Sequence, residues 1–125
     1  MGFKYVSIPV TTAGSAGSAS GSGVSTSIVR GEILGVYLNF HGSAPATTDT
    51  TVKTTGSGPA SYTFLTVSIS ATDGYFAPRS GAVSSSNAAI TDSAVPFAVC
   101  DTLTVALAQC DALTNAVVAH ILYRD

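Results

Sequence analysis

Very few residues of this 125-residue chain could act as acids, bases or nucleophiles near neutral pH. There are two histidines, His41 and His120, and a single glutamate, Glu32. Nucleophilic catalysis needs a nucleophile, a base and a group that orients the base, and neither histidine lies in a recognisable catalytic motif. His120 alternates with apolar residues, which predicts a core or interface histidine with a satisfied hydrogen bond, and His41 beside Gly42 predicts a turn. We therefore expect no catalytic residue and no enzymatic activity.

The spacing of potential metal ligands does not indicate a metal site either. The sequence has no Cys-x-x-Cys and no His-x-x-x-His pair. Five aspartates lie in predicted turns and are expected to cap them by accepting hydrogen bonds from nearby backbone N–H groups; they are Asp49, Asp73, Asp92, Asp101 and Asp111. We expect no metal ion and no cofactor. A calcium ion held by oxygen ligands from separate loops is the alternative.

The two cysteines, Cys100 and Cys110, are separated by a predicted strand. An extended segment of that length spans roughly 30 Å, at about 3.3 Å per residue, whereas a disulfide needs Cα atoms within about 7 Å of each other. We therefore expect two free, small, buried thiols rather than an internal bridge.

An aromatic pair beside an arginine is the densest group of chemically distinctive residues. Tyr75 and Phe76 precede Pro78 and Arg79. If exposed, these side chains would anchor a partner protein. The alternative is a loop that folds its aromatic side chains into the core.

The composition favours assembly over catalysis. Ala, Ser, Thr, Val and Gly make up more than half of the chain, and only 10% of the residues are charged. Small uncharged residues allow close backbone approach and broad contacts between proteins. The net charge is −2, and the few basic residues are scattered, so the basic face of a nucleic-acid-binding protein is missing. No run approaches the roughly 18 apolar residues of a membrane helix, and Met1–Val10 lacks the features of a signal peptide, so we expect synthesis in a cytoplasm and no membrane partner.

Alternation with a period of two residues dominates the chain and predicts an all-β fold. Residues 24–125 are expected to form the core of one sandwich, with jelly-roll-like topology, in a single domain of residues 1–125. Gly31 and Glu32 are expected to end one strand, after which Leu34, Val36 and Leu38 share a face of the next. The stretch Ala82–Ala89 is read as a loop or a turn of helix. The expected strands are Val6–Val10, Val24–Arg30, Ile33–Phe40, Thr50–Thr54, Tyr62–Ser70, Ala94–Val99, Thr102–Ala108 and Asn115–Arg124.

The sequence makes a separate prediction for each end of the chain. Residues 1–23 are predicted to be a strand followed by a Gly/Ser-rich arm or loop, and Pro9 places that strand at a sheet edge. Ala13–Gly23 has the composition of a flexible linker, so a flexible tether and a segment held in place are both open. The final strand, Asn115–Arg124, is apolar on both faces, which indicates either a central strand or one covered by another chain.

The order of these elements resembles small virion proteins of tailed bacteriophages that decorate or cement the capsid. The resemblance runs from about Ile28 to the last residue, and the Gly/Ser-rich stretch and the two cysteines depart from it. The segments that carry it are Arg30–Val36, Thr48–Thr54, Phe64–Val67, Asp73–Arg79, Asp101–Val105 and the apolar strand at the C-terminal end.

The resemblance implies a β-sandwich or jelly roll, often oligomeric, bound to the outer surface of the major capsid protein lattice. We therefore expect a decoration protein on the virion surface that stabilises the shell, acting as a homotrimer. A receptor- or glycan-binding module of a phage tail or fibre is the alternative. The residues expected to contact the partner are Phe3, Tyr5, Val6, Ile8, Val10, Tyr75, Phe76 and Arg79.

Overall fold

A computed structural model describes residues 2–56, 63–79 and 94–125, and in these ranges the chain forms nine β-strands and no helix. The all-β prediction is confirmed. None of the described segments is a helix that could span a membrane. The strands are β1 (Phe3–Val10), β2 (Ala19–Val24), β3 (Val29–Phe40), β4 (Asp49–Thr54), β5 (Thr63–Val67), β6 (Gly74–Phe76), β7 (Phe97–Asp101), β8 (Leu103–Cys110) and β9 (Val117–Arg124).

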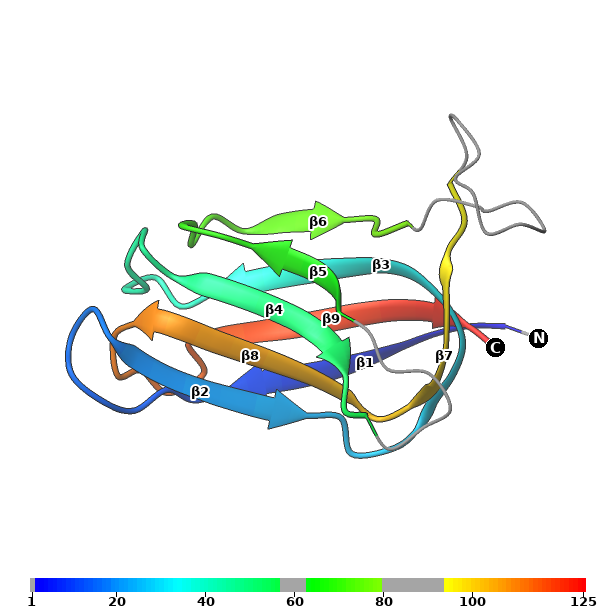
Figure 1. Cartoon of the computed structure of the whole chain (residues 1–125), viewed down its shortest axis with the longest axis horizontal. Coiled ribbons are helices and arrows are strands. Elements are labelled where there is room, and N and C mark those ends of the chain that lie inside the picture. The colour runs from blue at the N-terminus through cyan, green and yellow to red at the C-terminus, as the bar shows by residue number, and fades with distance from the viewer. Residues whose placement is uncertain (1, 57–62, 80–93) are drawn as a thin grey trace, which may run out of the picture.

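The strands form two antiparallel sheets that pack face to face, so the predicted β-sandwich is confirmed (Figure 1). One sheet has the order β1-β9-β3-β6, with β7 also paired to β3, and the other has the order β2-β8-β4-β5. With β7 left aside, these are the two orders that an eight-stranded jelly roll would give. We keep the jelly roll as an interpretation of this topology.

The hydrophobic core lies between the two sheets and is built by alternate residues of each strand. Val36, Leu38 and Ile121 come from the five-stranded sheet, and Val52 and Val105 face them from the four-stranded one; all five are fully buried. Each such side chain contributes about 1.5–3 kcal/mol through removal from water. The alternate residues of the same strands must therefore point outward, and these outward residues are the ones available to partners.

The strand that contains Gly31 is longer than predicted. The expected break at Gly31 and Glu32 is wrong, because β3 continues through both residues, pairing first with β7 and then with β9. Gly31 has a φ of 127°, which bends the strand without ending it. A register shift opposite β9, between Ile33 and Gly35, then reverses the alternation. Ile33 is therefore fully buried, and Leu34 is only half-buried.

The strand predicted at Tyr62–Ser70 ends earlier than expected. Within the described residues it is β5, and it stops at Val67. Ile69 is expected to share a face with Leu65 and Val67, but it lies in the following loop with a φ of 53° and is 75% exposed. A β-branched residue rarely adopts this left-handed conformation.

The Gly/Ser-rich segment is part of the sandwich and is not a free arm. Ala13 and Ser20 exchange two backbone hydrogen bonds that close the turn between them. The residues that follow form β2, which pairs with β8 from Ala19 to Val24. Of the two alternatives left open by the composition, the flexible tether is therefore wrong.

Two glycines explain why this segment has such a composition. The strand β2 passes directly over the end of β1, and an added Cβ would lie 2.2 Å from the Thr11 carbonyl oxygen at Gly21 and 2.3 Å from the Pro9 carbonyl oxygen at Gly23. Only glycine permits such an approach. One side of the sandwich is thus closed by backbone-to-backbone packing.

The positions of the first and last strands match two expectations. The strand β1 lies at the edge of its sheet, as Pro9 predicts, and β9 lies between β1 and β3. The apolar character of β9 on both faces therefore reflects a central strand, which was one of the two alternatives.

Aspartates fasten the loops to distant strands. Four of them accept backbone hydrogen bonds, but from donors far away in the sequence and not from their own turns, so the prediction of nearby donors is wrong for these bonds; Asp101 also accepts from the neighbouring Thr102 N–H at 2.7 Å. Asp92, like Ala82–Ala89, lies outside the described residues. Their carboxylates accept from Ile69 (Asp49, 2.9 Å), Phe40 (Asp73, 2.7 Å), Gly56 (Asp101, 2.8 Å) and Gly17 (Asp111, 2.8 Å).

Both cysteines are free, as expected, but they differ in exposure. Cys110 is buried, whereas Cys100 is exposed, so the prediction of two buried thiols is wrong for Cys100. The reason is the alternation of β7, in which Val99 and Asp101 point inward and Cys100 points outward.

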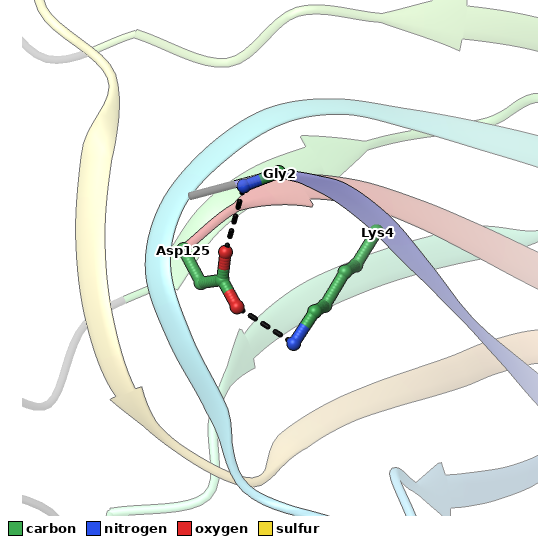
Figure 2. Close-up of polar contacts among 3 residues, drawn as sticks. All are labelled: Gly2, Lys4 and Asp125. Carbon is green, nitrogen blue, oxygen red and sulfur yellow. Dashed lines mark hydrogen bonds and ion pairs between the residues drawn. The ribbon is translucent and has the colours of Figure 1, made fainter.

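The first and last described residues meet at one end of the sandwich. Figure 2 shows that the Asp125 carboxylate accepts a hydrogen bond from the Gly2 backbone N–H at 3.0 Å and forms an ion pair with the Lys4 ammonium group at 2.6 Å. The hydrogen bond from Lys4, and then that from Gly2, lowers the pKa of Asp125, while the hydrogen bond with Asp125 raises the pKa of Lys4.

Candidate interaction face

The outward residues of the five-stranded sheet bring aromatic side chains together from segments far apart in the sequence. In one row across the sheet, Ser7 on β1 lies opposite His120 on β9, His120 lies opposite Tyr37 on β3, and Tyr37 lies opposite Tyr75 on β6. The rings of Tyr37 and His120 are in contact, with centroids 6.2 Å apart. This row therefore crosses four strands.

A second row lies next to the first. Tyr5 lies opposite Leu122, and Leu122 lies opposite Gly35. The phenol of Tyr75 extends over Gly35, since a Cβ added there would lie 1.9 Å from the Tyr75 hydroxyl oxygen. The absence of a side chain at Gly35 thus makes room for the ring of Tyr75.

A third row ends the face near the chain termini. Phe3 lies opposite Arg124, and Arg124 lies opposite Glu32. The Arg124 guanidinium and the Glu32 carboxylate form an ion pair with an N–O distance of 2.7 Å. Both side chains are partly exposed, so this pair contributes little to stability, about 0–1 kcal/mol.

We call this surface the aromatic face, defined by Phe3, Tyr5, Tyr37, Tyr75 and His120. The exposed fractions of its first four members are 71%, 71%, 40% and 58%. They are the four aromatic residues among the eight large hydrophobic residues that are exposed in the described ranges. Solvent exposure of this many aromatic rings on one sheet is typical of a surface that another molecule covers.

The outward surface of the other sheet is different in kind. Across it lie Ser22, Ala106, Thr51 and Thr66, which are small and mostly hydroxylated. A neighbouring row contains Thr104, flanked by Val24 and Lys53. The described part of this surface carries no aromatic residue in these rows, so the two faces of the sandwich are not equivalent as binding surfaces.

Ser7 and His120 bring a hydroxyl and an imidazole within hydrogen-bond distance. The Ser7 Oγ lies 2.7 Å from the His120 Nδ1. The hydrogen bond predicted for His120 is therefore present, on the outward side of the sheet. A nucleophilic site also needs a group that orients the base, and within the described ranges Ser7 is the hydrogen-bond partner found for His120. His41 accepts a hydrogen bond from the Ser43 backbone N–H at 3.0 Å, which matches its predicted role in a turn.

Three of the predicted contact residues meet on the aromatic face. Phe3 and Tyr5 reach it from β1, and Tyr75 reaches it from β6, which lies at the other edge of the same sheet. Their grouping depends on the strand order and could not be read from their separation in the sequence. That they contact a partner stays a prediction.

The residues that alternate with Phe3 and Tyr5 have a different role. Ile8 is 1% exposed and Val10 is fully buried, so these two predicted contact residues belong to the core. Val6 is half-buried and packs against the core. The physical reason is the alternation of a β-strand, which sends neighbouring residues to opposite sides of the sheet.

Tyr75 and its neighbours divide in the same way. Phe76 is half-buried and packs against the core, opposite in direction to Tyr75. The Arg79 guanidinium donates hydrogen bonds to the carbonyl oxygens of Leu34 at 3.1 Å and Pro78 at 2.8 Å. The sequence left two alternatives for this segment, exposed aromatic side chains or aromatic side chains folded into the core. The first holds for Tyr75, which is exposed, and the second holds for Phe76, which folds inward.

Sequence reasoning missed Tyr37 as a member of the aromatic face and Leu122 as its neighbour, and it left His120 open as a core or interface histidine. A signal was present, because Tyr37 alternates with core residues of β3, and His120 and Leu122 alternate with those of β9.

In the described ranges no three side chains of His, Cys, Asp or Glu gather closely enough to hold a metal ion.

Comparison of the chain with protein-family models, with curated proteins and with solved structures finds no match.

Proposed function

We propose that this protein is a non-enzymatic virion structural protein that binds the outer surface of a phage capsid through its aromatic face and stabilises the shell. The observation that carries the proposal is the gathering of Phe3, Tyr5, Tyr37 and Tyr75 on the outward side of one sheet. The resemblance of the chain's segment order to capsid decoration proteins supports the choice of the major capsid protein as partner.

Burial of these rings supplies a plausible free energy of docking. Covering one large side chain is worth about 1.5–3 kcal/mol, and several rings together must offset roughly 4–15 kcal/mol of lost rigid-body freedom. The aromatic face is flanked by side chains that can form hydrogen bonds, including Ser7, Asn39 and Glu32. An apolar centre with a polar rim is the usual anatomy of a protein interface.

Stabilisation of the shell follows from mass action. A protein that binds the assembled shell and not the separate subunits shifts the equilibrium toward assembly. At a free concentration of 100 times Kd, each occupied site adds about 2.7 kcal/mol. Because a shell has many such sites, moderate affinity at each one is sufficient.

The test compares decorated and undecorated shells. Wild-type protein is expected to co-sediment with empty shells and to raise the temperature at which the shells come apart. Replacement of both Tyr5 and Tyr75 by Ser should lower occupancy at least ten-fold. The matched control is Val24→Ser, which removes an exposed apolar side chain (49% exposed) from the other sheet. Shells of equal stability with and without the protein would refute the proposal.

We further propose that the protein works as a homotrimer. Light scattering on the purified protein gives its mass directly. A trimer that becomes a monomer in the Tyr5 and Tyr75 double variant would show that the aromatic face joins copies of the chain, and docking to the shell would then need another surface. If the double variant is still a trimer, the aromatic face does not join copies of the chain, and it remains free to bind the capsid.

The alternative is a receptor- or glycan-binding module of a tail or fibre. Exposed tyrosines next to Ser7 and His120 could stack on sugar rings and bind their hydroxyl groups, and this is the observation that favours it. A glycan array distinguishes the two functions. Binding to defined glycans together with no binding to shells would favour the tail module.

A further inference from the structure

A recess lies at the end of the sandwich where Gly2 and Asp125 meet. It has a volume of about 500 Å³ and is lined by Lys4, Ile28, Arg30, Tyr123 and Asp125. We call it the end cleft. Lys4 and Tyr123 face each other across β1 and β9, and they alternate with Phe3, Tyr5 and Arg124, which point to the aromatic face. The end cleft therefore opens on the opposite side of the same sheet.

The bend at Gly31 builds one wall of the end cleft. At this residue β3 passes so close to the end of β9 that an added Cβ would lie 2.0 Å from the Arg124 carbonyl oxygen. The φ of 127° at Gly31 makes the bend possible. The segment that precedes the bend supplies Ile28 and Arg30, and it is thereby held opposite Lys4 and Tyr123.

The side-chain charges that line the end cleft do not balance. The Asp125 carboxylate already serves both the Lys4 ammonium group and the Gly2 N–H (Figure 2). No ion pair joins Arg30 to a carboxylate of the described residues. Two cationic side chains and one carboxylate thus line a recess in a chain whose net charge is −2.

The other two arginines of the chain are engaged within the protein. Arg124 forms an ion pair with Glu32, and Arg79 donates to two backbone carbonyl oxygens. A guanidinium group is suited to bind a carboxylate through two parallel hydrogen bonds. Arg30 is therefore the arginine best placed to bind an external anion.

We propose that the end cleft binds an acidic segment of a partner protein, with Arg30 pairing to its carboxylate and with Ile28 and Tyr123 contacting its apolar atoms. A polypeptide fits better than a small acid, because Ile28 is 52% exposed at the cleft and the ring of Tyr123 also lines it. A peptide that enters the cleft can cover these apolar atoms while its carboxylate pairs with Arg30. This proposal goes beyond the docking role of the aromatic face and does not depend on it.

The experiment is a titration of isotope-labelled full-length protein, followed by amide chemical shifts. The probe is the peptide acetyl-Leu-Glu-Leu-amide, and its uncharged counterpart is acetyl-Leu-Gln-Leu-amide. We expect saturable shifts at Lys4, Ile28, Arg30 and Tyr123 with the first peptide, and affinity at least ten-fold weaker with the second. Arg30→Gln should weaken binding of the acidic peptide at least ten-fold. Lys53→Gln removes the same unit of charge from the other sheet and should leave the affinity unchanged.

Several results would overturn the proposal. They are an absence of shifts in the wild-type protein, equal affinity for the two peptides, or equal affinity of the wild-type protein and Arg30→Gln. Equal affinity for succinate and for the acidic peptide would assign the cleft to a small carboxylic acid and not to a protein segment. Spectra of each variant away from the cleft establish that it is folded. Because the Tyr5 and Tyr75 variant keeps the end cleft intact, it should still bind the peptide even if decoration of shells proves wrong.

Discussion

Substitution of Gly21 or Gly23 by Ala tests the closure of the sandwich between β1 and β2. In the structure, a Cβ at these positions would lie 2.2 Å from the Thr11 carbonyl oxygen and 2.3 Å from the Pro9 carbonyl oxygen. The obstructing atoms are backbone atoms of Pro9, in β1, and of Thr11, directly after the end of β1. The strand β1 is paired with β9 along its whole length. The strand β2 is held by β8 in the same way. Neither strand can therefore make room for the new methyl group by a simple change of side-chain rotamer.

The expected cost follows from the size of this overlap. Ordinary contact begins at 3.4 Å, so each new methyl group requires a separation of the two strands by about 1 Å. Overpacking of this kind costs about 1–3 kcal/mol, and Ala regains roughly 0.5–1 kcal/mol relative to Gly within a strand. We expect each variant to lose about 1–2 kcal/mol. The double variant should lose less than the sum, because the first methyl group already moves β2 away from β1.

Urea unfolding measures the effect, with the free energy of unfolding compared at constant m-value. Gly42→Ala is the control, since no atom lies within 4 Å of a Cβ at that position, and its stability should change by less than about 0.5 kcal/mol. If Gly21→Ala and Gly23→Ala unfold at the same urea concentration as Gly42→Ala, the two strands do not approach as described.

Four further predictions concern single residues. Asp101→Ala should lower the free energy of unfolding by about 1–3 kcal/mol, because the buried Asp101 carboxylate accepts charge-assisted hydrogen bonds from the backbone N–H groups of Gly56 and Thr102; urea unfolding equal to wild type would contradict this. The hydrogen bond from the lysine ammonium group lowers the pKa of Asp125 from its ordinary value of 3.8, so the carboxylate stabilises the fold above that pH and loses this effect as the pH falls through the lowered pKa. The melting temperature of Asp125→Asn should therefore depend less on pH at the acidic end, and an unchanged profile would argue against the ion pair. Ile69→Asn should raise stability by up to about 1 kcal/mol by relieving a left-handed conformation, and a loss in thermal unfolding would speak against that strain. A thiol reagent should label Cys100 quickly in the folded protein and Cys110 only after unfolding, whereas equal labelling rates would contradict their different exposure.

Local alternation was sufficient to predict seven of the nine described strands, but not β2, β6 or the irregularities. The strand expected at Val24–Arg30 is wrong, because residues 25–28 form the loop between β2 and β3. The pattern around Leu34, Val36 and Leu38 predicts one continuous face, yet the register shift beside Gly35 moves Ile33 into the core instead of Leu34. Such a bulge depends on the partner strand, which lies some 90 positions away in the sequence and leaves no local trace. Gly21 and Gly23 lie in a Ser-rich segment whose composition is typical of a linker. The carbonyl groups that require these glycines belong to Pro9 and Thr11, so the local sequence does not show why glycine is needed.

The aromatic face could be predicted only in part. The types of Phe3, Tyr5 and Tyr75 mark them as contact residues, and alternation in a strand should have separated Tyr75 from Phe76 and Tyr5 from Val6. That Tyr75 and Tyr5 share a surface follows from the order β1-β9-β3-β6, which is set by long-range pairing. The end cleft likewise depends on tertiary structure, because Lys4, Arg30 and Tyr123 come together only when β3 bends over the end of β9.

The meeting of Gly2 and Asp125 has a mechanical consequence. The strands β1 and β9 run antiparallel, and their pairing begins at Phe3 with Arg124 and ends at Val10 with Val117. A pulling force applied between the two ends would therefore load one rung of the ladder at a time, as in the opening of a zipper. The fold should resist such a pull weakly, however stable it is to heat. A force spread over the aromatic face would act on four strands of the sheet at once, β1, β9, β3 and β6, and these strands would then share the load.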